Sequence, residues 1–125
     1  MNIHEAMKDI VSLRSDSMDG VAQELEKMFG SLPECLHELL AMKPGHYETD
    51  KSDPLIKLNK TGILNFEYNF SYDILGKGMI PIFDAFDGRY IVYRVAESDF
   101  CVYCVISEKS SWITKDICEL IKRYF

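Results

Sequence analysis

Cys101 and Cys104 have the C-x-x-C spacing found in redox-active pairs and in metal sites. The surrounding segment, DFCVYCVISE (residues 99–108), has the apolar and aromatic composition of a β-strand. Side chains three positions apart in a strand point to opposite faces, so this pair cannot form a disulfide or share a metal ion. A thioredoxin-type pair would instead lie at the N-terminus of a helix, where the thiol pKa is lowered. The spacing therefore predicts two cysteines packed in a strand.

Two other short motifs begin like catalytic signatures but lack a required residue. His37-Glu38 starts the zinc-protease pattern H-E-x-x-H, yet Ala41 occupies the position of the second histidine. Gly76-Lys77-Gly78 lacks the remaining glycines and the Ser or Thr of a phosphate loop, and a predicted strand follows it instead of a helix. We therefore expect no catalytic residue, no cofactor and no metal, and a protein that is not an enzyme.

Length and charge limit the class of protein. The chain of 125 residues fits one domain, residues 1–125. Asp and Glu number 20 against 14 Lys and Arg, a net charge of −6, and no basic cluster suits direct binding to nucleic acid. The first residues lack the core of a signal peptide, and no apolar run could span a bilayer. We expect a cytoplasmic protein without membrane contact; its acidic surface suits a basic partner, although acidity is also common among soluble proteins.

Apolar residues recur at helical spacing in the first third of the chain. Residues 3–11 and 21–29 each form an amphipathic stripe, and Gly30 is expected to end the second helix. A residue of Ser15-Asp16-Ser17 is expected to cap it. Ser31 and Glu34 have the spacing of a capping box at the start of a third helix, which Pro44-Gly45 would stop.

The spacing of apolar residues changes to two in the middle of the chain. Residues 47–54 are polar and are expected to form a loop. ILNFEYNF (residues 63–70) alternates as a strand with one wet face, and Gly76-Lys77-Gly78 is expected to be a turn. The apolar face of this strand would carry Leu64, Phe66, Tyr68 and Phe70.

Three more strands are predicted in sequence. Asp87-Gly88 is a strong hairpin signal between MIPIF (79–83) and RYIVYRV (89–95). Pro81 argues for an edge position or a bulge, because proline has no N–H to donate. A turn at Glu97-Ser98-Asp99 leads into FCVYCVI (100–106).

Helical spacing returns at the end of the chain, where Ser110 or Ser111 is expected to cap a helix with Ile113 and Ile117 on its buried face. The order of elements predicts an α+β fold: an antiparallel β-meander packed with N-terminal helices and one C-terminal helix. The expected core contains Leu36, Leu39, Leu40, Phe66, Ile91, Val102, Ile117 and Leu120.

Three segments together resemble the SUKH superfamily, which includes fungal regulators of cell-wall synthesis and many bacterial immunity proteins. Residues 21–45 are similar to its N-terminal signature, a helix ending in glycine followed by Leu-Pro and a short helix. Residues 78–95 are similar to its Ile-Pro-Ile strand and the strand after it. Residues 102–121 resemble its late Val-Tyr strand and closing helix.

The resemblance implies a non-catalytic binding platform, of which bacterial members neutralise toxins that are often nucleases. The leading hypothesis is therefore an immunity protein that blocks a cognate toxin. An intracellular regulatory or adaptor module of the same superfamily, with a partner unrelated to toxins, is the alternative. An enzyme with an unrecognised site is a third class, which a deep pocket with convergent carboxylates would favour.

Strand parity suggests where a partner would bind. Alternate connections of a meander lie at the same end of the sheet, so several acidic residues are expected to form one rim that meets a basic toxin domain. Nearby cations, Lys51, Lys57, Arg89 and Lys109 among them, would offset part of its charge. The Glu97–Asp99 turn should lie at the other end, beside Gly76–Gly78. The candidate partner-binding residues are Glu48, Asp50, Asp53, Asp84, Asp87 and Glu108.

Overall fold

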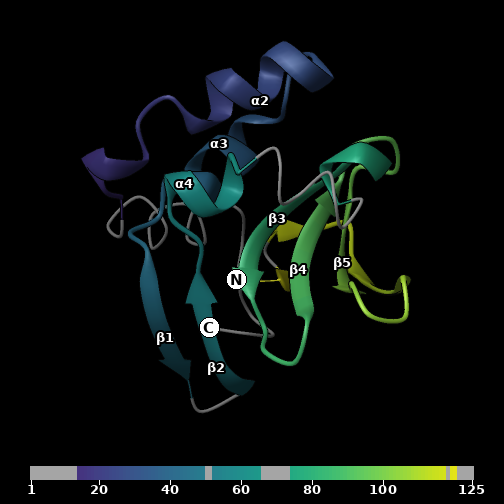
Figure 1. Cartoon of the computed structure of the whole chain (residues 1–125). Coiled ribbons are helices and arrows are strands. Elements are labelled where there is room, and N and C mark those ends of the chain that lie inside the picture. The colour runs from purple at the N-terminus through teal and green to yellow at the C-terminus, as the bar shows by residue number, and fades with distance from the viewer. Residues whose placement is uncertain (1–13, 50–51, 66–73, 118, 121–125) are drawn as a thin grey trace.

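The computed structural model describes residues 14–49, 52–65, 74–117 and 119–120. The helical elements are η1 (Asp16–Met18), α2 (Val21–Phe29), α3 (Glu34–Leu40), α4 (Lys60–Ile63) and η2 (Leu75–Lys77). The strands are β1 (Gly45–Thr49), β2 (Ser52–Lys57), β3 (Met79–Asp84), β4 (Arg89–Arg94), β5 (Asp99–Cys104) and β6 (Lys109–Thr114). The six strands form one antiparallel sheet in chain order, and Figure 1 shows α2, α3 and α4 gathered at one end of it; this confirms an α+β fold with a meander sheet.

Helix α2 begins and ends at glycines. Gly30 follows its last residue with φ 81°, a left-handed value that glycine adopts without strain, and this confirms the predicted end. The predicted serine cap is wrong for α2, whose N-cap is Gly20. Ser15 instead caps η1, because its side-chain oxygen accepts a hydrogen bond from the Ser17 N–H. The predicted helix over residues 3–11 lies outside the described residues.

Helix α3 starts without the predicted capping box. Its N-cap is Pro33, and no side chain caps it. Glu26 of α2 instead binds the chain just before α3, because its Oε2 accepts a hydrogen bond of 2.9 Å from the Leu32 N–H. The loop before α3 is therefore held by the preceding helix. The buried side of α3 is as predicted and consists of Leu36, Leu39 and Leu40.

The polar stretch over residues 47–54 is a hairpin, so the prediction of a loop is wrong. Strand β1 pairs with β2 from Gly45↔Lys57 to Thr49↔Ser52. Backbone pairing is independent of side-chain polarity, and Leu55 and Lys57 of β2 are buried, at 4% and 1% exposure. Two buried residues on one side of β2 thus attach an otherwise polar hairpin to the core.

The strand predicted from Ile63 does not begin there, because Ile63 is the last residue of α4. The Asn59 side chain caps this helix by accepting a hydrogen bond of 2.7 Å from the Gly62 N–H. Residues 66–70, the rest of the predicted strand, lie outside the described residues.

The hairpin β3–β4 forms around Asp87-Gly88, as predicted. Pro81 lies in an inner strand, at an irregularity where the β3–β4 register shifts between Pro81 and Phe83. The pairing of β2 with β3 ends at Lys57↔Phe83, so Pro81 lies beyond the part of β3 that β2 pairs with. The predicted bulge is confirmed, and the edge position is wrong.

Residues Lys109–Thr114 form β6, so the predicted start of the C-terminal helix at Ser110 or Ser111 is wrong. Trp112 pairs with Cys101 and Thr114 with Phe100, which leaves Ile113 as one extra residue in β6. Helical conformation begins only near residue 117, where the Leu120 N–H donates to the Asp116 carbonyl at 3.1 Å. Residues 121–125 of the predicted helix lie outside the described residues.

The main core lies between the helices and one face of the sheet. Of the predicted core residues, six are buried in this cluster: Leu36, Leu39, Leu40, Ile91, Ile117 and Leu120. Val102 packs against it partly buried, and Phe66 lies outside the described residues. A second, smaller cluster covers the other face of the sheet and contains Ile74, Met79, Val92, Cys101 and Tyr103.

Candidate functional site

The two cysteines of the C-x-x-C motif lie on opposite faces of β5, as predicted. Cys101 belongs to the smaller cluster, whereas Cys104 has the parity of Phe100 and Val102, which pack against the main core. Burial raises the pKa of the Cys101 thiol to about 11, so this thiol stays protonated near neutral pH. Hydrogen bonds with Ser107 lower the pKa of Cys104. Within the described part of the chain, no three His, Cys, Asp or Glu side chains are grouped to hold a metal ion.

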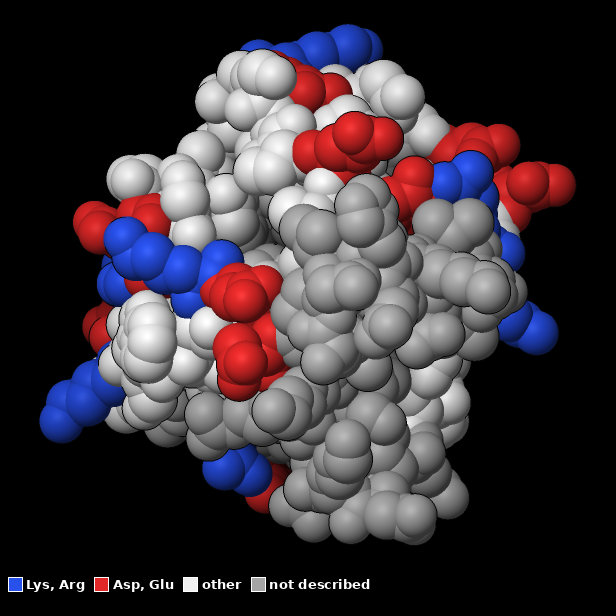
Figure 2. Space-filling model, turned by 180° about the vertical axis from the view of Figure 1, so that it is seen from behind, with Lys and Arg blue, Asp and Glu red and all other residues white. Residues whose placement is uncertain are grey.

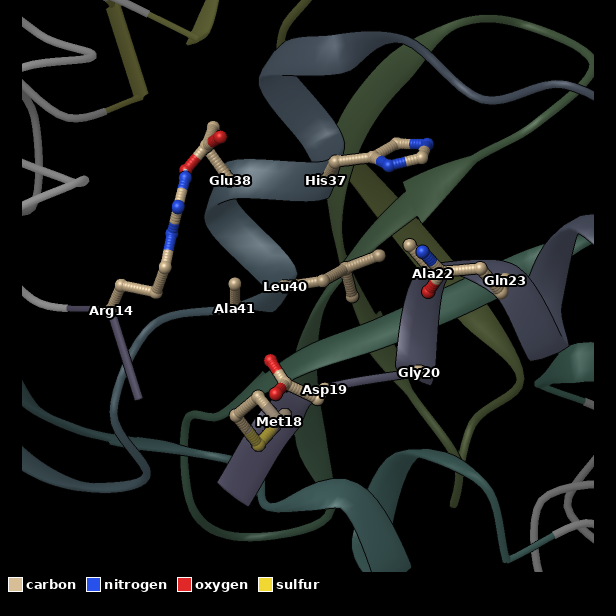
Figure 3. Close-up of a pocket in the computed structure, with 10 residues that line it drawn as sticks. All are labelled: Arg14, Met18, Asp19, Gly20, Ala22, Gln23, His37, Glu38, Leu40 and Ala41. Carbon is tan, nitrogen blue, oxygen red and sulfur yellow. The ribbon is translucent and has the colours of Figure 1, made fainter. Parts of the chain in front are cut away.

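A cavity of about 180 Å³ lies between η1, α2 and α3. Figure 3 shows Arg14 and Glu38 meeting tip to tip on one side of α3, whereas the His37 side chain extends from the opposite side of this helix. His37 Nε2 lies 3.2 Å from Glu26 Oε1, so this lining side chain also has a partner within the chain. These internal pairs reduce what the cavity offers to a ligand, and we place the candidate site elsewhere. The lining residues are Arg14, Met18, Asp19, Gly20, Ala22, Gln23, His37, Glu38, Leu40 and Ala41.

The β3–β4 turn and the β5–β6 turn lie at the same end of the sheet and contact each other. The Val105 N–H donates to the Gly88 carbonyl at 2.9 Å. The Ile106 side chain lies over Gly88, where an added Cβ would be only 3.2 Å from Ile106 Cδ1. The turns that carry Asp84, Asp87 and Glu108 are thus neighbours. We call Asp84, Phe86, Asp87, Ile106 and Glu108 the turn surface.

The structure describes the remaining candidate acids only in part. Glu48 lies in β1 and Asp53 in β2, but their side chains and the whole of Asp50 lie outside the described residues. The β1–β2 hairpin extends past the β3–β4 turn at the same end of the sheet (Figure 1), because Ile56 already pairs with Asp84. The parts of β1 and β2 that contain Glu48 and Asp53 therefore reach the end of the sheet that carries the turn surface.

The turn between β4 and β5 lies at the opposite end, as strand parity predicts. The Val95 N–H donates to the Gly78 carbonyl at 2.9 Å, which places this turn beside η2. Asp99 is 2% exposed and accepts bonds of 2.7 and 2.5 Å from Arg94. The Arg94 hydrogen bonds lower the pKa of Asp99. Asp99 is therefore the buried half of an ion pair and contributes little free surface charge.

Each acid of the turn surface has a partner within the chain. Asp84 Oδ1 accepts a hydrogen bond of 2.8 Å from the Phe86 N–H. Asp87 lies 3.7 Å from the Arg89 guanidinium, and Glu108 lies 3.6 Å from Lys77 Nζ. Acidic and basic side chains also lie next to one another on the face shown in Figure 2. The local field is thus weaker than the count of acids suggests.

Two apolar side chains of the turn surface were not predicted as site residues. Ile106 is 80% exposed and Phe86 is 39% exposed, whereas most large apolar residues in the described part of the chain are buried. Phe86 lies in the sequence Asp-Ala-Phe-Asp-Gly, which is typical of a turn. A large apolar residue inside a turn is expected to be exposed, so the sequence held a signal for this site residue. Ile106 is the last residue of the predicted strand over residues 100–106, so its residue type could not separate it from the core.

Lys57 is a buried cation that joins α3 to the sheet. Its Nζ donates to the carbonyls of Leu40 at 3.0 Å and Leu58 at 2.9 Å. Leu40 is the last residue of α3, so the ammonium group lies at the negative end of the helix dipole. Burial lowers the pKa of Lys57 to about 7. Lys57 was expected to offset the charge of the acidic rim, but with 1% exposure it is a structural cap instead.

Comparisons with models of protein families, with curated proteins and with solved structures find no match to this chain. None of the helices in the part of the chain that the structure describes has the length and apolarity needed to pass through a bilayer.

Proposed function

We propose that this chain is a non-catalytic protein-binding module and that the turn surface contacts its partner. The observation that carries the proposal is the composition of two touching turns, in which Phe86 and Ile106 are exposed among three acids. Aromatic and aliphatic residues surrounded by polar ones are typical of the centre and rim of protein interfaces.

The resemblance to the SUKH superfamily points to the kind of partner. Together with the net charge of −6, it supports an immunity protein that neutralises a cognate toxin domain, with a nuclease as a suitable target. A regulatory or adaptor module of the same superfamily is the second candidate, because the turn surface suits either role. A cytoplasmic location fits both.

Co-expression tests the toxin hypothesis. We expect the chain to restore growth to cells that express a toxin domain encoded beside its gene, and to copurify with that domain. Failure to protect against any neighbouring gene product, combined with stable binding to a different protein, would favour the adaptor.

The acids of the turn surface are expected to contribute modestly to association. For the double variant Asp87→Asn, Glu108→Gln, we expect the association rate constant with the toxin domain to fall about two- to threefold at low salt, and to depend less on salt. The effect is small because Arg89 and Lys77 already pair with these carboxylates. Stopped-flow kinetics would measure it.

The matched control is Glu97→Gln, which removes one exposed acid at the opposite end of the sheet. Asp84 is left intact because its carboxylate holds the Phe86 backbone. If Glu97→Gln slowed association as much as the double variant, steering would depend on net charge and not on the turn surface.

A further inference from the structure

Phe86 has a backbone conformation that a large side chain rarely adopts. Its φ is 68°, in the left-handed region, where Asp87 and Gly88 follow with φ 55° and 75°. Asn, Asp and Gly are the usual residues there, and a bulky one is an outlier. Strained residues of this kind concentrate at functional sites, where the surrounding structure maintains them.

Three hydrogen bonds maintain this conformation. The Phe86 N–H donates to Asp84 Oδ1 at 2.8 Å. The Phe86 carbonyl accepts from the Arg89 N–H at 3.0 Å and from Arg89 Nε at 3.4 Å. Both sides of the residue are thus fixed by the chain itself, while the ring remains partly exposed. Asp84 and Arg89 are therefore positioning residues, and their charges are engaged in holding the turn.

Ile106 is held beside this turn by a second set of contacts. The Val105 N–H bond to Gly88 joins the two turns, and Gly88 has no Cβ that would displace the Ile106 side chain. Glycine suits position 88 for two reasons, its positive φ and the space that Ile106 occupies. The two exposed apolar side chains thus lie on turns that a backbone hydrogen bond joins.

We propose that Phe86, supported by Ile106, is a preformed anchor that inserts into an apolar pocket on the partner protein. The inference rests on the proposed function and adds the chemistry of the partner's surface. The partner offers an apolar pocket for the ring, with polar groups around it that suit the partly paired acids of the turn surface. Preorganisation of the ring avoids the entropy that an exposed, mobile side chain would lose on binding.

The first part of the test needs only the chain itself. Phe86→Asn keeps a residue that tolerates positive φ and removes the ring. We expect its melting temperature to be equal to that of the wild type or higher by up to about 5 °C, since strain is relieved and only a part-exposed ring is lost. A clearly lower melting temperature would show that the ring stabilises the fold, and would overturn the anchor role.

The second part measures binding to the toxin domain that the co-expression experiment identifies. We expect Phe86→Asn to raise Kd by at least about thirtyfold and Ile106→Ala by about tenfold, as residues at interface centres do. Phe86→Tyr keeps an aromatic ring and should stay within about threefold of the wild type. Isothermal titration calorimetry would give the Kd values.

Met28→Ala is the matched control, because Met28 has the same 39% exposure as Phe86 but lies on α2. We expect it to leave Kd unchanged. Trp112 is 61% exposed on β6, and a loss of affinity in Trp112→Ala with none in Phe86→Asn would overturn the inference while leaving the proposed function intact. If no neighbouring gene product bound the wild-type chain, the toxin hypothesis would be wrong, and the same variants would be compared on the different protein that binds the chain stably; equal Kd values for the wild type and Phe86→Asn there would overturn the anchor.

Discussion

Leu39→Ala is expected to lower the free energy of unfolding by about 2–5 kcal/mol, as truncation of fully buried leucines does. Leu39 is 0% exposed and lies in the main cluster, between α3 and the covered face of the sheet. The loss combines the transfer of the removed atoms with the cavity that they leave, because packed neighbours relax only in part. Urea denaturation followed by circular dichroism would measure it, through a shift in midpoint at constant slope.

Met28→Ala provides the comparison for this measurement. It shortens an apolar side chain of α2 that is 39% exposed, so we expect a change within about 0.5 kcal/mol. Similar losses for Leu39→Ala and Met28→Ala would mean that α3 is not packed on the sheet as the structure describes.

The second large effect is expected at Lys57, whose pKa burial lowers to about 7 from an ordinary value of 10.5. Between these pH values the unfolded chain binds a proton at this residue and the folded chain does not. Stability therefore rises with pH through this window. The rise is at most about 5 kcal/mol, since a difference of one in pKa corresponds to about 1.4 kcal/mol. The two carbonyl acceptors and the α3 dipole favour the charged form and reduce the rise below that limit.

Lys57→Met isolates this contribution, because methionine has similar length and no charge. We expect the stability of the wild type relative to Lys57→Met to increase from pH 7 to pH 10.5 and to stay constant below pH 7. Other groups that titrate in this range act on both proteins and cancel in the difference. Denaturation midpoints at several pH values would test it, and parallel profiles for the two proteins would contradict it.

Elements with a strong periodic pattern or a specific turn signal could be predicted from the sequence. Helix α2 and the hairpin at Asp87-Gly88 belong to this group. Strand β6 could not be predicted, because Ile113 fits the helical spacing of Ile117 and Leu120 and is buried in either conformation. Pairing with β5 selects the strand, and such long-range pairing leaves no trace in local periodicity.

The hairpin β1–β2 was not predicted for a different reason. Its sequence is polar, so hydrophobic alternation does not mark it, and backbone pairing together with the inward-pointing Leu55 and Lys57 forms it. A buried lysine cannot be recognised from sequence, because lysine is normally exposed. The burial of Lys57 is explained only by the Leu40 carbonyl at the end of α3, which accepts a hydrogen bond from its Nζ.

The location of the candidate site was predicted better than its chemistry. Strand parity alone placed Asp84, Asp87 and Glu108 in turns at one end of the sheet. Their partners could not be predicted, because the distances from Asp87 to Arg89 and from Glu108 to Lys77 depend on how the turns fold. The exposure of Phe86 also depends on how the turn folds. Its φ is positive, a value that phenylalanine rarely adopts, so the sequence does not predict it.

The extra residue Ile113 in β6 has a consequence for behaviour at high concentration. Beyond β6 the sheet has no further strand among the described residues, and a flat outer strand is a template for fibre growth by strand addition. A bulge bends such a strand and interrupts the regular row of donors and acceptors, while Lys109 places a charge near its start. We therefore expect the irregular end of β6 to disfavour polymerisation through this outer strand.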